Sequence, residues 1–319
     1  MAVTIDQYWS YRFHDQIHLQ YQQMSMRLQD KIDPMMVHRD VSAAIDHHER
    51  LGALIANDVI SPFGQTKILN PLHSRRAVAL QSSDAAVLVS DENTLRSMVN
   101  PQNAYTQTIV AALGRRADLH VINDGLGSAQ VASVTAGTGV ITYATQAMLS
   151  ANYLGTSVTS INLATIIKTA ALLSKSACPN GAGERIFAYA PGQLADLLAI
   201  TQASSSDFTK NTIHDRGTIN NLDWEGFTWV EIPDVLDPAN AVLQRMLPYT
   251  AGASAAAPAT RTCMAFHKSA IGLSIGRDIT TKINERPDLN NSIQVRSVMM
   301  QAAVRVWDAA VCGVYALEN

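Results

Sequence analysis

The sequence lacks paired cysteines, a long apolar run and a secretory signal. Its three cysteines, Cys178, Cys263 and Cys312, are far apart and form no CxxC pair. An odd number of cysteines without paired spacing favours free, mostly buried thiols, as in proteins of a reducing cytosol. No stretch approaches the roughly 18 consecutive apolar residues of a membrane helix, so no membrane partner is expected. The opening, MAVTIDQYWS, has no basic segment followed by an apolar one, so no secretory signal is expected.

A strong excess of one charge is also missing. The formal net charge is −3 over 319 residues, which argues against a strongly basic, histone-like protein but leaves room for DNA contact on one face. Hydrophobic residues make up 47% of the chain, enough to offset the entropy of ordering, so a disordered chain is not expected. The length predicts one large or two modest domains.

Patterns for metal-dependent chemistry are incomplete. His14 and His18 have the i, i+4 spacing that can bind zinc from one helix face. Asp15 stands where the HExxH metalloprotease pattern has glutamate, and no third ligand follows at useful spacing. We therefore interpret His14 and His18 as weak candidates and predict no metal. In the HHE run at 47–49, adjacent side chains face different ways on most elements, which favours a solvated turn.

Patterns for enzymatic chemistry are incomplete as well. HRD at 38–40 begins like a kinase catalytic loop, but the rest of the kinase motifs are absent. The GxG triplets at 125–127 and 181–183 neither complete GxGxxG nor precede GK[ST], and no GxSxG occurs. We predict no catalytic residues and no cofactor.

The first 90 residues divide into two segments. Residues 1–45 are polar, and their sparse apolar residues at helical spacing predict a long, thinly amphipathic helix. Such a helix has too little apolar surface for its own core, so we expect an arm that docks on a neighbouring subunit or on its own domain. Residues 46–90 alternate like strands around Gly52 and Gly64 and predict a long two-stranded excursion with a polar tip. A hairpin of this kind needs partners from elsewhere in the fold or from another chain.

The middle of the chain predicts both helices and strands. Asn100 and Pro101 begin a helix that runs to about residue 124 and ends near Gly125 and Gly127, a rod of roughly 35 Å. A second helix follows a possible cap at Ser160. We then expect a buried strand at 185–190, a short helix after residue 191, a hairpin over 218–232 and a flexible loop at 252–259.

The last 60 residues read as strands. Four strand patterns occupy 264–268, 279–286, 293–306 and 311–317, with a turn near 287–291 and no helix between them. They predict an antiparallel meander. Together with the central helix and the mixed middle, this gives an α+β fold.

Three stretches resemble one family. NPQNAYTQTIVAALGRRADLHVINDGLGSA at 100–129 is similar to the spine helix of the tailed-phage major capsid proteins, which have the Hong Kong-type capsid fold. GTINNLDWEGFTWVEIPDV at 217–235 is similar to a strand pair of that family with a glycine and an aromatic residue at its turn. The stretch 262–318, with AFHKSAIGLSIGRDI and VRSVMMQAAVRVWDAAVCGVYAL, is similar to its closing segment.

The resemblance implies a shell-building subunit without enzymatic activity. Axial domains would meet at the centres of hexamers and pentamers, the extended loop would lie across a neighbour, and the arm and spine would bend as the shell expands. The implied division of the chain is an arm at 1–45, an extended loop at 46–90, a peripheral domain with the spine helix at 91–150, an axial domain at 151–260 and return strands of the peripheral domain at 261–319.

The loop carries the residues that we expect to contact other subunits. Arg75 and Arg76 suit intersubunit ion pairs, because guanidinium groups favour bidentate contacts with carboxylates. The alternative is that these charges block unwanted pairing at a strand edge. Some relatives cross-link through a Lys–Asn isopeptide bond, and Lys67 lies in the corresponding loop without a pattern that predicts reaction. The predicted assembly contacts are Gly52, Phe63, Gly64, Lys67, Arg75 and Arg76.

The implied partners are further copies of the chain and packaged double-stranded DNA, contacted without sequence preference. Scaffolding, portal and cement proteins are further implied partners. The implied location is the head of a virion assembled in a host bacterial cytoplasm. One alternative is an encapsulin-like compartment that encloses an enzyme cargo. The other is a different class of protein, either a soluble α+β enzyme or a phage tail protein.

Overall fold

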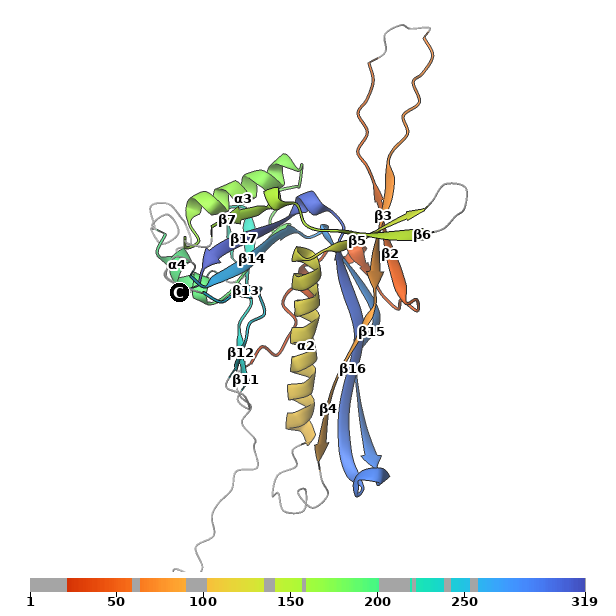
Figure 1. The fold of residues 1–319 in the computed structure, drawn as a ribbon, viewed down its shortest axis with the longest axis vertical. Helices are drawn as coiled ribbons and strands as arrows, with labels where there is room; N and C mark the ends of the chain where they lie inside the picture. Colours follow the sequence, from red (N-terminus) through yellow and green to blue (C-terminus); the bar gives the residue numbers. More distant parts are fainter. Residues whose placement is uncertain are drawn as a thin grey trace, which may run out of the picture.

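The computed structural model describes residues 22–58, 64–89, 102–134, 141–156, 159–200, 219, 222–237, 242–252 and 258–318. Its helices and strands build three larger sheets and one small hairpin around a long helix (Figure 1). Within these residues, no helix is both long enough and apolar enough to cross a membrane.

The first sheet has both faces covered. In strand β8 (Arg185–Tyr189), Phe187 and Tyr189 point toward helices α3 (Leu163–Lys175) and α4 (Gly192–Leu198). Ile186 and Ala188 point toward helix α2 (Gln102–Leu126). Because alternate residues of a strand face opposite sides, a strand between two helical layers is apolar on both faces, as β8 is after Arg185. The strands, in spatial order, are β7 (Tyr153–Gly155), β17 (Val311–Leu317), β14 (Thr260–His267), β8 (Arg185–Tyr189), β10 (Phe227–Glu231) and β9 (Asp223–Trp224), with β13 (Tyr249–Thr250) on β14.

Helix α2 (Gln102–Leu126) is the central rod. At 1.5 Å per residue it is roughly 38 Å long. It lies along a four-stranded sheet whose long strands extend well below the first sheet (Figure 1). Leu113 and Ala117 pack on Met299 of this sheet. Its strands, in order, are β1 (Val37–His38), β15 (Ile271–Arg286), β16 (Ser292–Arg305) and β4 (Gln81–Val89).

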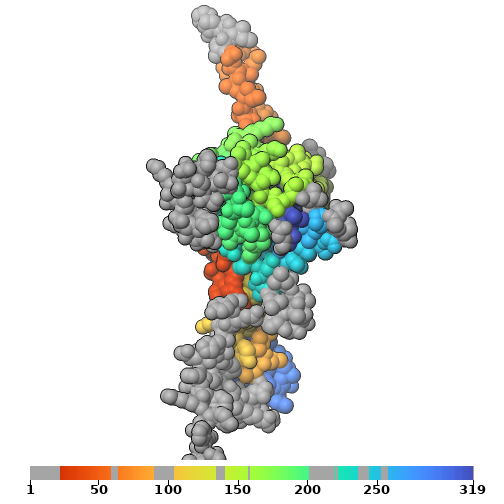
Figure 2. Space-filling model, turned by 90° about the vertical axis from the view of Figure 1, so that its left-hand side faces the viewer, coloured from red at the N-terminus to blue at the C-terminus, as the bar shows by residue number. Residues whose placement is uncertain are grey.

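The third sheet carries a projection. Strands β2 (Ile45–Leu51) and β3 (His73–Ala79) pair antiparallel, and the chain between them extends far from the body (Figures 1 and 2). Strands β5 (Ala129–Val134) and β6 (Ile141–Gln146) complete the order β2-β3-β5-β6. The described residues between β2 and β3 contain no helix or strand.

The remaining elements are short or cover the first sheet. They are helices α3 (Leu163–Lys175) and α4 (Gly192–Leu198), the hairpin β11 (Val235–Asp237) and β12 (Val242–Gln244), and the 3-10 turns η2 (Gln29–Lys31), η3 (Pro34–Met36), η4 (Ser150–Asn152), η5 (Pro287–Leu289) and η6 (Asp308–Ala310).

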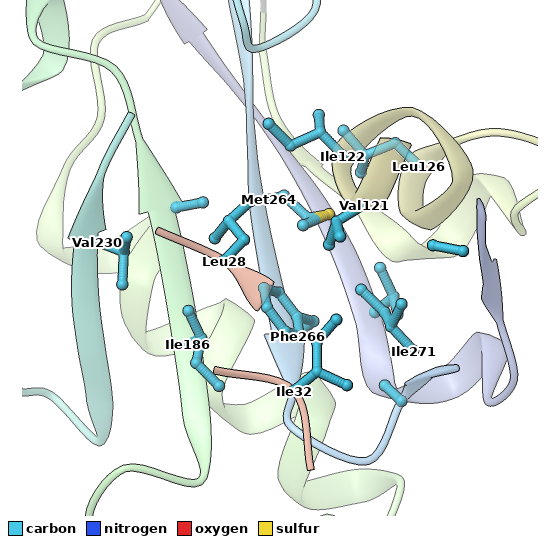
Figure 3. Packing of buried hydrophobic residues seen from close by; sticks show 14 of the residues in the cluster. Leu28, Ile32, Val121, Ile122, Leu126, Ile186, Val230, Met264, Phe266 and Ile271 are labelled. Carbon is cyan, nitrogen blue, oxygen red and sulfur yellow. The ribbon is translucent and has the colours of Figure 1, made fainter. Parts of the chain in front are cut away.

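The described part of the arm docks on its own chain. Leu28 and Ile32 insert between α2 and the first sheet, beside Met264 and Phe266 (Figure 3). The buried Asp118 of α2 accepts hydrogen bonds from Gln23 Nε2 and from the backbone nitrogens of Arg27 and Leu28. One carboxylate therefore satisfies three donors of an irregular segment.

Several predicted elements are confirmed. The long helix begins and ends within two residues of its predicted bounds, and β8 and α4 lie where the sequence places them. The hairpin predicted over 218–232 is β9 and β10, which turn at Glu225 and Gly226, both with positive φ. The flexible loop predicted at 252–259 falls largely outside the described residues.

Other predictions are wrong. Residues 22–45 contain 3-10 turns rather than the predicted amphipathic helix, because Leu28 and Ile32 are drawn into the core of an irregular chain. Helix α3 is capped by Asn162, not Ser160: Asn162 Oδ1 accepts the backbone N–H of Thr165.

The predicted meander is also wrong. Strands β14 and β17 pair with each other in the first sheet, whereas β15 and β16 pair in the second. Four consecutive strands therefore serve two sheets, and the segment 261–319 does not form one layer.

Candidate functional site: the projecting loop and its base

The projecting loop (residues 52–72) exposes apolar side chains. Ile55 is 87% exposed and Ile68 94% exposed, although burying either would be favourable by roughly 2 kcal/mol. The tip at 59–63, which was predicted to be polar, lies outside the described residues, and the stretches on either side of it expose apolar side chains. The six exposed apolar side chains on the described part of the loop and its adjoining strand end are Leu51, Leu54, Ile55, Ile68, Leu69 and Leu72.

The predicted contact residues of this loop lie in different surroundings. Gly52 N donates to Leu72 O at 2.8 Å where the polypeptide leaves β2 and returns to β3. A Cβ at residue 52 would lie 3.3 Å from that oxygen, so this position favours glycine. Gly64 and Lys67 are exposed. Phe63 lies outside the described residues, as do His14 and His18.

The two arginines of β3 have partners within their own chain. Arg75 Nη2 lies 3.1 Å from Glu49 Oε1 across the β2–β3 pair. The side chain of Arg76 is fully buried and pairs with Asp308. The structure thus gives Arg76 an internal partner in place of the neighbouring subunit predicted for it, because the position faces inward from the sheet.

Asp308 gathers three arginines at the base of the loop. Besides Arg76, Arg305 Nε donates to its carboxylate at 2.7 Å, and Arg50 Nη1 lies 3.9 Å from it. Burial lowers the pKa of Arg76, and the Asp308 charge opposes that shift. Arg305 also donates to the carbonyls of Gly125 and Gly127 at the end of α2, where the helix dipole favours a cation.

A second polar cluster joins β1, β2 and β15. His38 Nδ1 lies 2.7 Å from Asp46 Oδ2, and His48 Nε2 lies 3.9 Å from the same oxygen. Ser274 Oγ donates to Asp46 Oδ2 at 2.6 Å and lies 3.1 Å from His48 Nε2. The two imidazoles stack with centroids 4.1 Å apart. Burial, with a smaller contribution from His38, lowers the pKa of His48 to about 4.

This cluster is not a catalytic triad. In a triad the carboxylate orients the far nitrogen of the histidine, and the histidine alone contacts the serine. Here Asp46 binds Ser274 directly, and the serine side chain is buried.

The sequence placed His38 and His48 in two separate motifs, at 38–40 and 47–49, and did not predict the cluster. The structure brings these two histidines together with Asp46. Asp46 and His48 are two residues apart on a strand and so share a face, a signal that the sequence did contain. The contribution of His38 depends on tertiary structure. His47 instead stacks near Tyr143, and Glu49 pairs with Arg75.

The three cysteines are free. Burial raises the pKa of Cys263 and of Cys312 to about 12, which suppresses the reactive thiolate. Neither residue is suited to act as a nucleophile.

Comparison with known proteins identifies the family. A sequence model described as phage capsid protein matches residues 5–318 of this chain. The chain belongs to the phage capsid protein family. It is therefore a structural subunit of the shell of a phage head. A search of curated protein sequences gave no match.

Solved structures share the fold of this phage capsid protein at low sequence identity. A structure from Mycobacterium phage Che8 is 17% identical, with a TM-score of 0.63 over 96% of this chain and 97% of that one. The capsid of cyanophage P-SCSP1u is 13% identical, with a TM-score of 0.68 over 100% and 96%. The head of Helicobacter pylori bacteriophage KHP40 is 10% identical, with a TM-score of 0.68 over 98% and 96%. The Hong Kong-type capsid fold expected from the sequence is confirmed.

Proposed function

We propose that this capsid protein assembles through hexamers and pentamers into a closed icosahedral shell around double-stranded DNA, with the projecting loop lying across a neighbouring subunit. The observation that carries the proposal is the loop itself. It extends away from the body, and together with the adjoining end of β2 it exposes six apolar side chains. An extended two-stranded excursion is not stable in water without a partner, and contiguous exposed apolar surface is typical of an interface.

The proposed domains keep the bounds predicted from the sequence, with one change in the strands of the last segment. The arm is 1–45, the extended loop 46–90 and the peripheral domain 91–150. We add β14 and β17, which lie almost entirely beyond residue 260, to the axial domain formed by 151–260, since they pair in the sheet that contains β8. The return strands of the peripheral domain are then β15 and β16, within 261–319.

The proposed partners are other copies of the chain, packaged DNA without sequence preference, and scaffolding, portal and cement proteins. Assembly takes place in the cytoplasm of the bacterial host. The role is mechanical rather than enzymatic, which is consistent with the buried Cys263 and Cys312 thiols and the covered Ser274 hydroxyl.

The test is negative-stain electron microscopy of the expressed protein, with size-exclusion chromatography to separate assemblies. Closed shells, or hexameric and pentameric capsomers, support the proposal, and shells that contain nuclease-protected DNA extend it to packaging. Shells filled with a protein cargo favour the encapsulin-like alternative. A uniform monomer or dimer across salt and protein concentrations contradicts the proposal.

A further inference from the structure

The cluster of His38, Asp46 and His48 has the composition of a metal site. Among the described residues, these three bring one ligand atom each within 4.8 Å of one another. Two imidazoles and a carboxylate are a ligand set that zinc and related ions accept, with the fourth position left to water. We propose that His38, Asp46 and His48 bind a divalent transition-metal ion of the zinc class at the base of the projecting loop.

The distances from Asp46 to the two histidines are close to those of a metal site. Ligand atoms about 2.0 Å from a tetrahedral ion lie roughly 3.3 Å apart. The Asp46 oxygen is now 2.7 Å from His38 Nδ1 and 3.9 Å from His48 Nε2, one distance shorter than this and one longer. A shift of the carboxylate by about half an ångström toward His48 would bring both close to that spacing. The ion would replace the proton that His38 now shares with Asp46.

The surroundings hold two of the ligands in place. Asp46 Oδ1 accepts the backbone N–H of His47 at 2.8 Å, and Oδ2 accepts the hydroxyl of Ser274. Outer hydrogen bonds of this kind orient carboxylate ligands. The ring of His48 lies against Gly272 so closely that a Cβ there would be 2.7 Å from it. His48 and Asp46 thus form the fixed part of the site.

His38 is the movable ligand. The two imidazole planes are only 12° from parallel, and an ion in the plane of His48 cannot also lie in the plane of a ring stacked on it. His38 must therefore turn out of the stack when the ion binds. Its side chain is 40% exposed and belongs to the two-residue strand β1, so it has room to turn. This exposed side also leaves an open position for water.

Metal binding would join segments that are otherwise held by few bonds. β1 pairs with β15 over two residues, and β2 begins the projecting loop. An ion between His38 and the two β2 ligands links the end of the arm to the base of the loop. This inference goes beyond the proposed function, because a shell can form with or without the ion.

The test uses the purified full-length protein after chelation and dialysis. Zinc binding is measured by calorimetry, and cobalt is added as a spectroscopic probe of tetrahedral nitrogen and oxygen ligands. The variants are His38→Ala, which removes an exposed ligand, Asp46→Asn, and Ser274→Ala, which removes a hydrogen bond to Asp46. His73→Ala is the matched control, since His73 is an exposed histidine on the neighbouring β3.

We expect the wild type and His73→Ala to bind one ion per chain with tetrahedral cobalt absorption. His38→Ala should weaken zinc binding on the order of 100-fold, and Ser274→Ala, which loosens Asp46, by about 10-fold. No binding by the wild type would overturn the proposal. So would binding that His38→Ala leaves unchanged, because the ion would then sit elsewhere. His38→Ala keeps the test decisive if Asp46→Asn does not fold.

Discussion

Single residues at the base of the loop balance charge inside the molecule. Arg76 and Arg305 are fully buried, and Asp308 is the carboxylate that both of them contact. Breaking a buried ion pair from one side leaves an uncompensated charge and is far more destabilising than breaking an exposed pair. Loss of the Asp308 carboxylate should therefore destabilise this region more than loss of any single hydrogen bond of Arg76 or Arg305.

The Asp308→Ala variant tests this dependence. We expect a loss of about 3 to 5 kcal/mol in the free energy of unfolding, because buried guanidinium groups lose their counter-charge. The measurement is denaturant unfolding of unassembled protein. Asp84→Asn is the control: it breaks the exposed pair with Arg296 and should change stability by less than about 1 kcal/mol. If Asp308→Ala and Asp84→Asn lowered the free energy of unfolding equally, Asp308 would not be the essential counter-charge of the buried arginines.

The stability of the folded protein should depend on pH through Asp124, near the end of α2. Burial raises its pKa from 3.8 to about 6, and the N–H of Ala303 only partly opposes this. Between these two values the folded state keeps a proton that the unfolded state has lost. The contribution of Asp124 to stability therefore falls as pH rises from about 4 to 6. A cavity of about 220 Å³ beside it gives water access and limits the effect.

The Asp124→Asn variant should not show this fall in stability with rising pH. We expect the variant to gain up to about 2 kcal/mol in unfolding free energy relative to the wild type between pH 4 and pH 7. Thermal unfolding across that range is the measurement. Asp278→Asn, which changes an exposed carboxylate beside Arg39, serves as the comparison. If the difference in stability between Asp124→Asn and the wild type stayed constant with pH, the prediction for Asp124 would be wrong.

At the scale of elements, α3 begins where a side chain satisfies one of the free N–H groups of its first turn. Asn162 accepts from both the backbone nitrogen and the hydroxyl of Thr165. Asn162→Ala should therefore lower the unfolding free energy by about 1 kcal/mol. Ser160→Ala, two residues earlier, should change it by less than about 0.5 kcal/mol. Chemical denaturation of both variants distinguishes them, and the reverse order of effects would restore Ser160 as the cap.

At the scale of the whole molecule, the projecting loop should matter for assembly and not for folding. Ile55 and Ile68 are almost fully exposed, so Ile55→Ser with Ile68→Ser should leave thermal unfolding of the subunit unchanged. We expect the same double variant to form no shells. Light scattering and electron microscopy measure shell formation. Lys67→Ala, which changes another exposed residue of the loop, should still assemble. Shells formed normally by the double variant would exclude the loop as an apolar contact.

The sequence by itself determined the elements that depend on local signals. A periodic stretch after the predicted cap at Asn100 became α2, the mostly apolar stretch RIFAY became β8, and the turn at Glu225 and Gly226 became the hairpin of β9 and β10. Each follows from contacts between residues close in the chain. The order of these elements was also enough to indicate the capsid family, since it reflects the whole chain rather than one motif.

Only the tertiary structure decided how distant residues meet. Nothing local separates β14 and β17 from β15 and β16, because all four are strand-like and their sheet depends on which partners they find. Nothing local turns Arg76 inward to Asp308, which is 232 residues away. His38 joins Asp46 and His48 only because β15 holds β1 beside β2. Periodicity fixes which side of a strand a residue faces, but burial and charge pairing depend on what the fold places opposite it.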